Sequence, residues 1–280
     1  MVSHFQSSSR FTRLAGLAAL LLLAFGAAGC NKLKARDNLN KGVQHFKGGR
    51  FDDAIENFKT AKQLDPTLLN ARLFLATAYA TQYIPGAPSE ENVRNGNEAL
   101  KEFKDVLQVD AKNLSAVDGA ASILFNMAGT PFDPKKFEEA RGYHTRHVEI
   151  KADDPTPHYS IGVIEWTLAY AGNKKMRVDY NASARKQVKD EDPMPTELRE
   201  KFVAEYGPIV ENGIHHLQKA MSLQQEYDDA MAYLNLLYRQ KADQVESPDD
   251  RNKLLQDADQ LVERVKVIKQ KKLEAASAAP

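Results

Sequence analysis

Small and large apolar residues recur at helical spacing along residues 42–66, the most clearly patterned stretch of the chain. Residues at such spacings lie on one face of a helix, and the small ones let two helices approach closely. Gly48 and Gly49 interrupt the pattern in its middle, and a proline ends it. The stretch therefore predicts a helical hairpin. The positions that carry the pattern are Gly42, Ala54, Phe58, Ala61 and Pro66.

The same pattern recurs four more times, always with one anchor on each of two predicted helices. The two anchors lie closest in the first copy, and the other four copies carry insertions between them, the longest in the fourth. The spacing along the sequence from each second anchor to the next first anchor is the same at all four junctions. Constant junctions fit units that stack to bury a continuous core, and variable turns fit loops in solvent. The anchor pairs are Gly42/Ala54, Ala76/Ala99, Ala121/Ala140, Gly162/Gly213 and Asn235/Ala258.

This pattern resembles the tetratricopeptide repeat (TPR), a helix–turn–helix unit of about 34 residues. The resemblance covers nearly all of residues 35–268 and implies an all-α, right-handed α-solenoid of about five TPR-like hairpins, several with inserted loops. The hairpins are expected near residues 35–68, 69–113, 114–154, 155–227 and 228–268.

In the TPR family the first helices line a concave groove that holds a partner protein or peptide. Aromatic residues and arginine are the usual energetic anchors of interfaces. The alternative for the single tryptophan is that it packs under the longest insertion. The six residues that the resemblance implies as partner contacts are Phe125, Tyr159, Val163, Trp166, Leu236 and Arg239.

The longest insertion, about residues 172–212, begins with a basic polar stretch and ends with a partly apolar one. The acidic run 190–192 follows the basic residues, which predicts a mobile polar loop, with docking of an acidic partner or of lipid headgroups as the alternative. Glu197–Val210 predicts an extra helix with Thr196 as its cap. Residues 269–280 are expected to form a frayed tail. The basic residues of the insertion are Lys174, Lys175, Arg177, Arg185, Lys186 and Lys189.

Residues 1–30 have the three parts of a secretory signal peptide. Arg10 and Arg13 carry the only charges, residues 14–28 form an uncharged run rich in leucine and alanine, and Gly29-Cys30 follows. The run is shorter than the about 20 apolar residues that span a bilayer. Residues 27–30, Ala-Ala-Gly-Cys, resemble a bacterial lipobox, although leucine is commoner where Ala27 stands. An uncleaved anchor and a secreted protein with a chance cysteine stay open as alternatives.

The lipobox resemblance implies that residues 1–29 are removed and that Cys30 carries several acyl chains. Two or more acyl chains bind a membrane stably, because each CH₂ buried in the bilayer contributes about 0.8 kcal/mol to binding. Residues 30–34 would then be a short lipidated tether, which places the first repeat close to the bilayer. Asn31 is not the aspartate that often retains such proteins at the inner membrane. The periplasmic face of the outer membrane is therefore the expected location.

Composition and motifs restrict the possible chemistry. The formal net charge is zero and no basic stripe is present, which argues against nucleic acid as a partner. One cysteine cannot form an intramolecular disulfide. The chain has no Gly-rich phosphate loop, nucleophile elbow or kinase signature. We therefore expect no cofactor and no catalytic residue.

The histidines invite a metal hypothesis, since His144 and His147 share one face of a predicted helix. Zinc requires three or four converging ligands, and no cysteine partner or H-E-x-x-H spacing accompanies them. The pattern favours a partly polar core in the third repeat and no metal site. His215 and His216 are adjacent and are expected to point apart.

The expected function is that of a membrane-anchored, non-enzymatic interaction scaffold of the bacterial cell envelope. Bacterial tetratricopeptide lipoproteins, which this sequence resembles, often serve in outer-membrane protein insertion, pilus secretin assembly and cell-wall synthesis. Two alternatives stay open. One is an envelope enzyme or metal-dependent hydrolase that uses the inserted loops, with His144, His147 and carboxylates in one cleft. The other is a structural spacer without a dedicated ligand.

Overall fold

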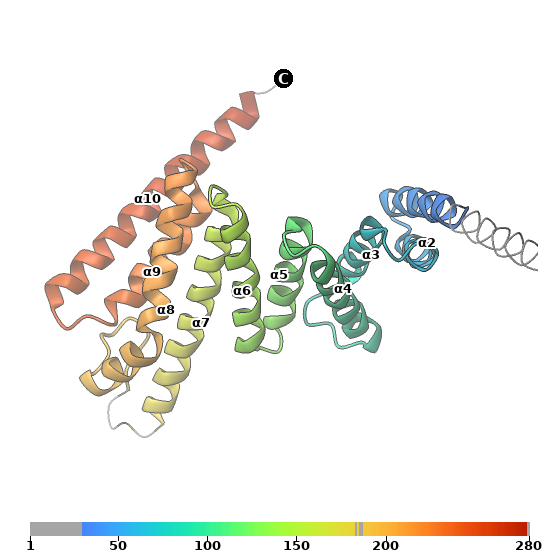
Figure 1. Ribbon diagram of the computed structural model, residues 1–280. Helices are drawn as coiled ribbons and strands as arrows, with labels where there is room; N and C mark the ends of the chain where they lie inside the picture. The colour runs from blue at the N-terminus through green and yellow to red at the C-terminus, as the bar shows by residue number, and fades with distance from the viewer. Residues whose placement is uncertain (1–29, 183, 185–186, 279–280) are drawn as a thin grey trace, which may run out of the picture. The chain divides into compact units, whose positions relative to one another are not determined.

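The computed structural model describes residues 30–278 except 183, 185 and 186, and each element assigned within them is a helix (Figure 1). The predicted signal peptide, Arg185, Lys186 and residues 279–280 lie outside the described residues. Within this described part, no helix is both long and apolar enough to cross a membrane. The predicted fold class, an α-solenoid of TPR-like hairpins, is confirmed.

The helices follow one another as first and second members of five hairpins. Each of the ten anchor residues of the sequence pattern lies on a different helix, and all ten are buried. The small residues thus occupy the helix crossings, as their spacing predicts. In chain order the pairs are residues 30–47 with α2 (Phe51–Leu64), α3 (Leu69–Gln82) with α4 (Glu90–Val109), α5 (Leu114–Ala128) with α6 (Pro134–Ile150), α7 (Pro155–Asn181) with α8 (Thr196–Leu223), and α9 (Asp228–Ala242) with α10 (Pro248–Ala278).

Several helices begin at residues that satisfy the free N–H groups of a first turn. The Asp154 carboxylate accepts from the backbone N–H of Thr156 at 2.9 Å, and a proline stands at the start of α7. Asp133 does the same for α6, and Ser89 accepts from the backbone N–H of Asn92 to cap α4. An acceptor at this position contributes about 1 kcal/mol to helix stability. The caps of α4 and α6 fix where two hairpin turns end, and the cap of α7 fixes where the connection between the third and fourth hairpins ends.

The described chain divides into two compact units, residues 30–123 and 124–278, with the division inside α5. In the first unit α3 packs against both α2 and α4. The buried carboxylate of Glu102 on α4 pairs with Lys62 on α2 at 2.5 Å and with Arg72 on α3 at 3.3 Å. One carboxylate therefore joins three helices.

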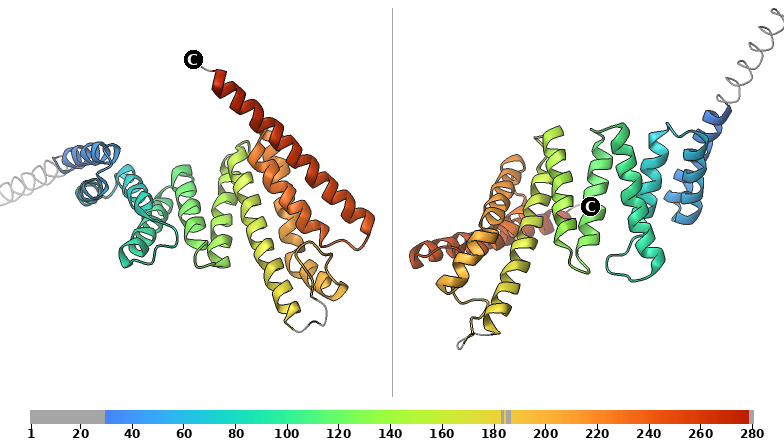
Figure 2. Two further views of the ribbon diagram at one scale, coloured as in Figure 1. Left: turned by 180° about the vertical axis from the view of Figure 1, so that it is seen from behind. Right: turned by 60° about the horizontal axis from the view of Figure 1, so that its bottom comes forward.

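The second unit is organised around α7, which packs against α6, α8 and α9, while α9 runs along α10 (Figure 2). Glu165 on α7 is fully buried. Its carboxylate accepts from Arg141 on α6 at 3.0 Å and from Asn212 on α8 at 2.5 Å. Burial raises the pKa of Glu165, and both hydrogen bonds oppose that rise.

The long insertion differs from its prediction, because most of it lengthens the two helices of the fourth hairpin. Residues 172–181 continue α7, and the expected extra helix is the first half of α8. Lys174, Lys175 and Arg177 are therefore helical. Arg177, expected in a polar loop, is 3% exposed.

The start of α8 also corrects a prediction. Thr196 is the first residue of the helix and does not cap it. Pro195 stands at the N-cap and makes no side-chain hydrogen bond to the helix.

Glycines mark where the lengthened helices approach each other. Gly162 lies against Leu217, and Gly172 lies against Tyr206, so that a side chain on either glycine would overlap its neighbour. The same antiparallel contact is thus repeated along the pair.

Both ends of the described chain are helical. Residues 30–34, expected as a tether, belong to the first helix, and residues 269–278, expected to fray, complete α10. Ion pairs account for the second difference. Lys272 on α10 pairs with Asp228 at the start of α9 at 2.6 Å, and Lys271 pairs with Glu226 at 3.5 Å. Lys272 also lowers the pKa of Asp228.

Candidate functional site

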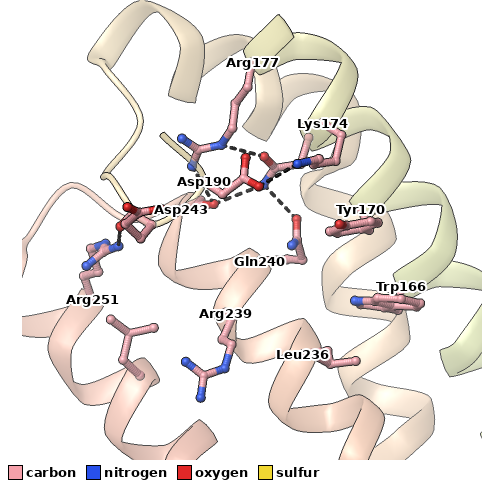
Figure 3. Close-up of a pocket in the computed structure, with 13 residues that line it drawn as sticks. Trp166, Tyr170, Lys174, Arg177, Asp190, Leu236, Arg239, Gln240, Asp243 and Arg251 are labelled. Carbon is pink, nitrogen blue, oxygen red and sulfur yellow. Dashed lines mark hydrogen bonds and ion pairs between the residues drawn. The ribbon is translucent and has the colours of Figure 1, made fainter. Parts of the chain in front are cut away.

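The second unit holds an open pocket of about 370 Å³, called the α7–α9 pocket below (Figure 3). It lies between α7, α9, the start of α10 and the loop that joins α7 to α8. Concave sites with apolar walls and a few convergent polar groups are the usual form of ligand sites. The lining residues are Trp166, Tyr170, Asn173, Lys174, Arg177, Asp190, Glu191, Leu236, Arg239, Gln240, Asp243, Arg251 and Leu255.

Aromatic rings form one wall of the pocket. Trp166 and Tyr170, one turn apart on α7, are stacked with ring centroids 5.3 Å apart and planes 18° apart. Tyr233 of α9 contacts Trp166 edge-on at 5.4 Å. Trp166 is partly buried and Tyr170 is 43% exposed. The wall therefore presents a flat apolar face that its neighbours hold in position.

A buried polar network forms the floor. Asn173 on α7 donates to the side-chain oxygens of Gln240 at 2.8 Å and of Asp243 at 3.0 Å, both in or next to α9. The Arg177 guanidinium donates to Asn173 at 2.8 Å and pairs with Asp243 at 3.0 Å. Buried charges persist where they are paired and hydrogen-bonded. The network fixes α7 against α9 beneath the pocket.

The same guanidinium fixes the loop between α7 and α8. Arg177 donates to the backbone oxygens of Lys189 at 2.7 Å and of Asp192 at 3.1 Å. Lys174 pairs with Asp190 at 2.5 Å, and Arg251 donates to the backbone oxygen of Glu191 at 3.1 Å. Residues 189–192 thus form a wall at one end of the pocket.

Three of the six predicted contact residues line the pocket together: Trp166, Leu236 and Arg239. The other three do not. The Phe125 ring packs edge-on against Phe137 at 5.4 Å, and Val163 is buried.

Tyr159 lies farther along the same row of rings. It contacts Tyr227 at 5.2 Å and Tyr233 at 5.8 Å. Burial raises its pKa. Tyr159 therefore supports the aromatic wall from outside the pocket, because Tyr233 also contacts Trp166.

Sequence reasoning missed Tyr170, Arg251 and the residues of the loop wall. Tyr170 follows Trp166 by four residues, and that helical spacing could have predicted a shared face. Arg251 belongs to a second helix, whereas the repeat pattern assigns groove contacts to first helices. The loop carbonyls reach the pocket only because Arg177 is buried beneath them, which no local pattern signals.

The histidines form a pair that the sequence did not predict. His216 on α8 meets a residue of the facing helix, because its Nδ1 lies 2.8 Å from Nδ1 of the buried His158 on α7. Burial lowers the pKa of both rings, and that of His216 falls to about 4. Both rings are therefore neutral at pH 7, with one N–H shared between them.

This pair predicts a loss of stability in acid. An unfolded histidine takes up a proton near pH 6.5, whereas folded His216 does so near pH 4. Stability should therefore be complete above pH 6.5 and should fall as pH decreases towards 4, by about 2 kcal/mol for this partly exposed group. Urea unfolding of wild type and His216→Gln at pH 7 and pH 4.5 measures the difference. His215→Gln, at the exposed neighbour, should keep the wild-type fall, and an equal fall in all three proteins would contradict the assignment.

His144 and His147 do not assemble a metal site. His147 is buried, and its Nε2 lies 3.5 Å from a carboxylate oxygen of Asp154. Among the described residues, no three or more His, Cys, Asp or Glu side chains are grouped so that they could hold a metal ion. The third hairpin has the polar core position that the sequence favoured.

Comparison with known proteins places the fold. No protein-family model matches the chain, and no curated protein sequence matches it. Solved structures do match. A MamA crystal structure aligns with a TM-score of 0.53 and 15% identity over 82% of this chain and 93% of MamA. MamA residues 41-end from Desulfovibrio magneticus RS-1 align with a TM-score of 0.53 and 15% identity, over 84% of this chain and 96% of the MamA chain. YrrB, a TPR protein with an unusual peptide-binding site, aligns with a TM-score of 0.52 and 13% identity, over 89% of this chain and 96% of the YrrB chain.

These similarities extend over most of the chain. At such identities they establish the fold alone, which is that of the tetratricopeptide solenoids.

Proposed function

We propose that this chain is a non-enzymatic scaffold of the bacterial cell envelope, anchored through lipid on Cys30, that holds a partner protein or peptide in the α7–α9 pocket. The observation that carries the proposal is the convergence of Trp166, Leu236 and Arg239 on one open pocket. These three residues come from the first helices of two successive hairpins. An aromatic side chain and an arginine in one concave site are typical of interface anchors.

The partial exposure of the aromatic wall favours a ligand over a spacer role. Tyr170 leaves 43% of its surface in solvent although it is stacked on Trp166. Apolar walls beside a few charged groups are the usual lining of a ligand site. YrrB, a TPR protein with a peptide-binding site, supports the same class of ligand.

The anchoring part of the proposal rests on the lipobox resemblance and on Cys30. The thiol of Cys30 is free and exposed. Because Cys30 lies within the first described helix, a lipid there would hold the first hairpin close to the membrane surface. Asn31 favours the periplasmic face of the outer membrane over the inner membrane.

Affinity capture tests the groove part of the proposal. The lipidated protein, tagged at its C-terminus and cross-linked in cells, should enrich one partner that Trp166→Ala loses, because truncation removes the aromatic wall. Phe132→Ala is the matched control, since Phe132 is an exposed aromatic residue of the same unit outside the pocket. If Trp166→Ala retains the same partners, or if wild type enriches none, the groove does not bind a partner.

Membrane fractionation tests the anchoring part. Wild type should sediment with membranes, whereas Cys30→Ala should remain in the soluble fraction, because several acyl chains are needed for stable binding. Asn31→Asp should keep membrane association and move towards the inner membrane on a density gradient. A Cys30→Ala protein that still sediments with membranes would refute lipid anchoring and leave the groove proposal intact.

A further inference from the structure

Two carboxylates and one amide oxygen of the α7–α9 pocket already accept hydrogen bonds from neighbouring side chains. The Asp243 carboxylate accepts from Asn173 and Arg177, and the Gln240 side-chain oxygen accepts from Asn173. On the rim, Asp190 is paired with Lys174. These groups hold the pocket together and offer little to a ligand.

Its two remaining arginines keep unused donors. Arg239 donates to Asp259 at 2.6 Å and to Asn235 at 3.3 Å, and Arg251 donates to the Glu191 backbone oxygen as its one partner within the described residues. A guanidinium has five N–H groups, so both retain several. Arg251 has no ion pair among the described residues, and its buried Nε has no hydrogen-bond partner there.

These donors face the aromatic wall across the pocket. Figure 3 shows Arg239 and Arg251 on one side of the opening, with the Trp166 and Tyr170 rings on the other. Leu236 and Leu255 supply further apolar lining. A ligand that fits would carry an acceptor beside an apolar group.

Charge limits the acceptor to a single negative charge. Four basic side chains line the pocket, Lys174, Arg177, Arg239 and Arg251, against three acidic ones, Asp190, Glu191 and Asp243. A dianionic phosphate would meet three carboxylates within the same small space, whereas one carboxylate balances the single excess positive charge. Arginine also matches the planar geometry of a carboxylate with two parallel hydrogen bonds.

We infer that the α7–α9 pocket binds a peptide carboxylate on Arg239 and Arg251, with the adjoining apolar side chain against Trp166 and Tyr170. The inference rests on the proposed function and names the chemistry of its ligand. The wall at residues 189–192 closes one end of the pocket. The bound segment therefore ends or turns at the wall, and its carboxylate comes from an acidic side chain or from the C-terminus of the partner.

Peptide selection on the full chain in detergent tests this inference. Random dodecapeptides are displayed in two formats, one with a free C-terminus and one followed by a carrier protein, so that the two sources of carboxylate are distinguished. Binding of the most enriched peptides is measured by the fluorescence of Trp166, the single tryptophan of the chain. We expect enrichment of Asp, Glu or a free C-terminus next to an apolar residue.

The variants then assign the carboxylate to its site. Replacing the carboxylate by an amide should weaken binding about 10- to 100-fold. Arg251→Gln should weaken the acidic peptide by a similar factor, with little effect on its amide form. Arg264→Gln, at an exposed arginine on the same helix outside the pocket, should bind as wild type.

Two results would overturn the inference. One is an enriched set without a preference for acidic residues or a free C-terminus, and the other is unchanged binding of the acidic peptide by Arg251→Gln. Binding of peptides that carry no carboxylate, seen as quenching of Trp166 fluorescence, would refute the carboxylate-binding inference. The proposed peptide-binding function of the pocket would then still stand. If no peptide binds in either format, the peptide-binding function itself fails.

Discussion

Arg177→Met is expected to lower the free energy of unfolding of the second unit by about 3 to 5 kcal/mol. Arg177 is 3% exposed, and its guanidinium donates hydrogen bonds to Asn173, to Asp243 and to two backbone carbonyls of the loop. Methionine fills much of the same volume but donates nothing. The loss leaves Asp243 buried with one remaining donor, and breaking a buried pair in this way costs far more than the pair itself contributes.

Urea unfolding followed by circular dichroism measures this change, and hydrogen exchange locates it. Exchange should accelerate first at residues 187–192, because their carbonyl contacts to Arg177 are lost. Lys175→Met is the control. Lys175 is exposed and, within the described part of the chain, pairs with Asp179, so its replacement should leave the free energy of unfolding close to that of wild type. Equal stability of the two variants would show that the buried network contributes nothing.

Phe202→Ala is expected to destabilise the far end of the fourth hairpin by about 3 to 5 kcal/mol. Phe202 is fully buried and stacks on Tyr206 at 5.4 Å. It also forms a small core with Met194 and Leu198, against which Met176 and Tyr180 pack. Its buried residues are distinct from those of the main cluster of the unit, and Tyr206 packs against both, so the loss of Phe202 should open the end of the hairpin before the rest unfolds.

Native-state hydrogen exchange distinguishes this local opening from global unfolding. Protection should fall at residues 173–181 and 196–206 in Phe202→Ala, with little change in α9. Val203→Ala, at the neighbouring residue that is 40% exposed, should stay within about 0.5 kcal/mol of wild type. A uniform loss of protection across the unit would show that the end of the hairpin is not an independent unit.

The hairpins could be predicted because helix crossings require small residues at fixed separations. Gly42, Ala99 and Ala140 are buried for this reason, whatever the length of the turns between them. The end of α7 could not be predicted in this way. Its polar residues look solvated in sequence, and Arg177 is buried only because Asp243, far along the chain on the next hairpin, balances its charge.

The candidate site shows the same division. Trp166, Leu236 and Arg239 follow from their place in first helices, which the repeat pattern supplies. Arg251 and the loop wall depend on contacts between distant segments, as does the pairing of His158 with His216 on the facing helix. The local sequence pattern predicts the helical scaffold. The polar contacts of the candidate site could not be predicted, because they join charged residues that come together only in the folded chain.

The paired contacts of Gly162 with Leu217 and Gly172 with Tyr206 restrict how this protein can change during evolution. The step from one contact to the next is nearly the same along α7 as along α8 and is about three helical turns on each. Deleting one residue from either helix would rotate the next side chain by about 100° and move the glycine away from its partner. Viable insertions and deletions here should therefore come as whole turns, matched on both helices. Related sequences should show lengths of this hairpin that change in steps.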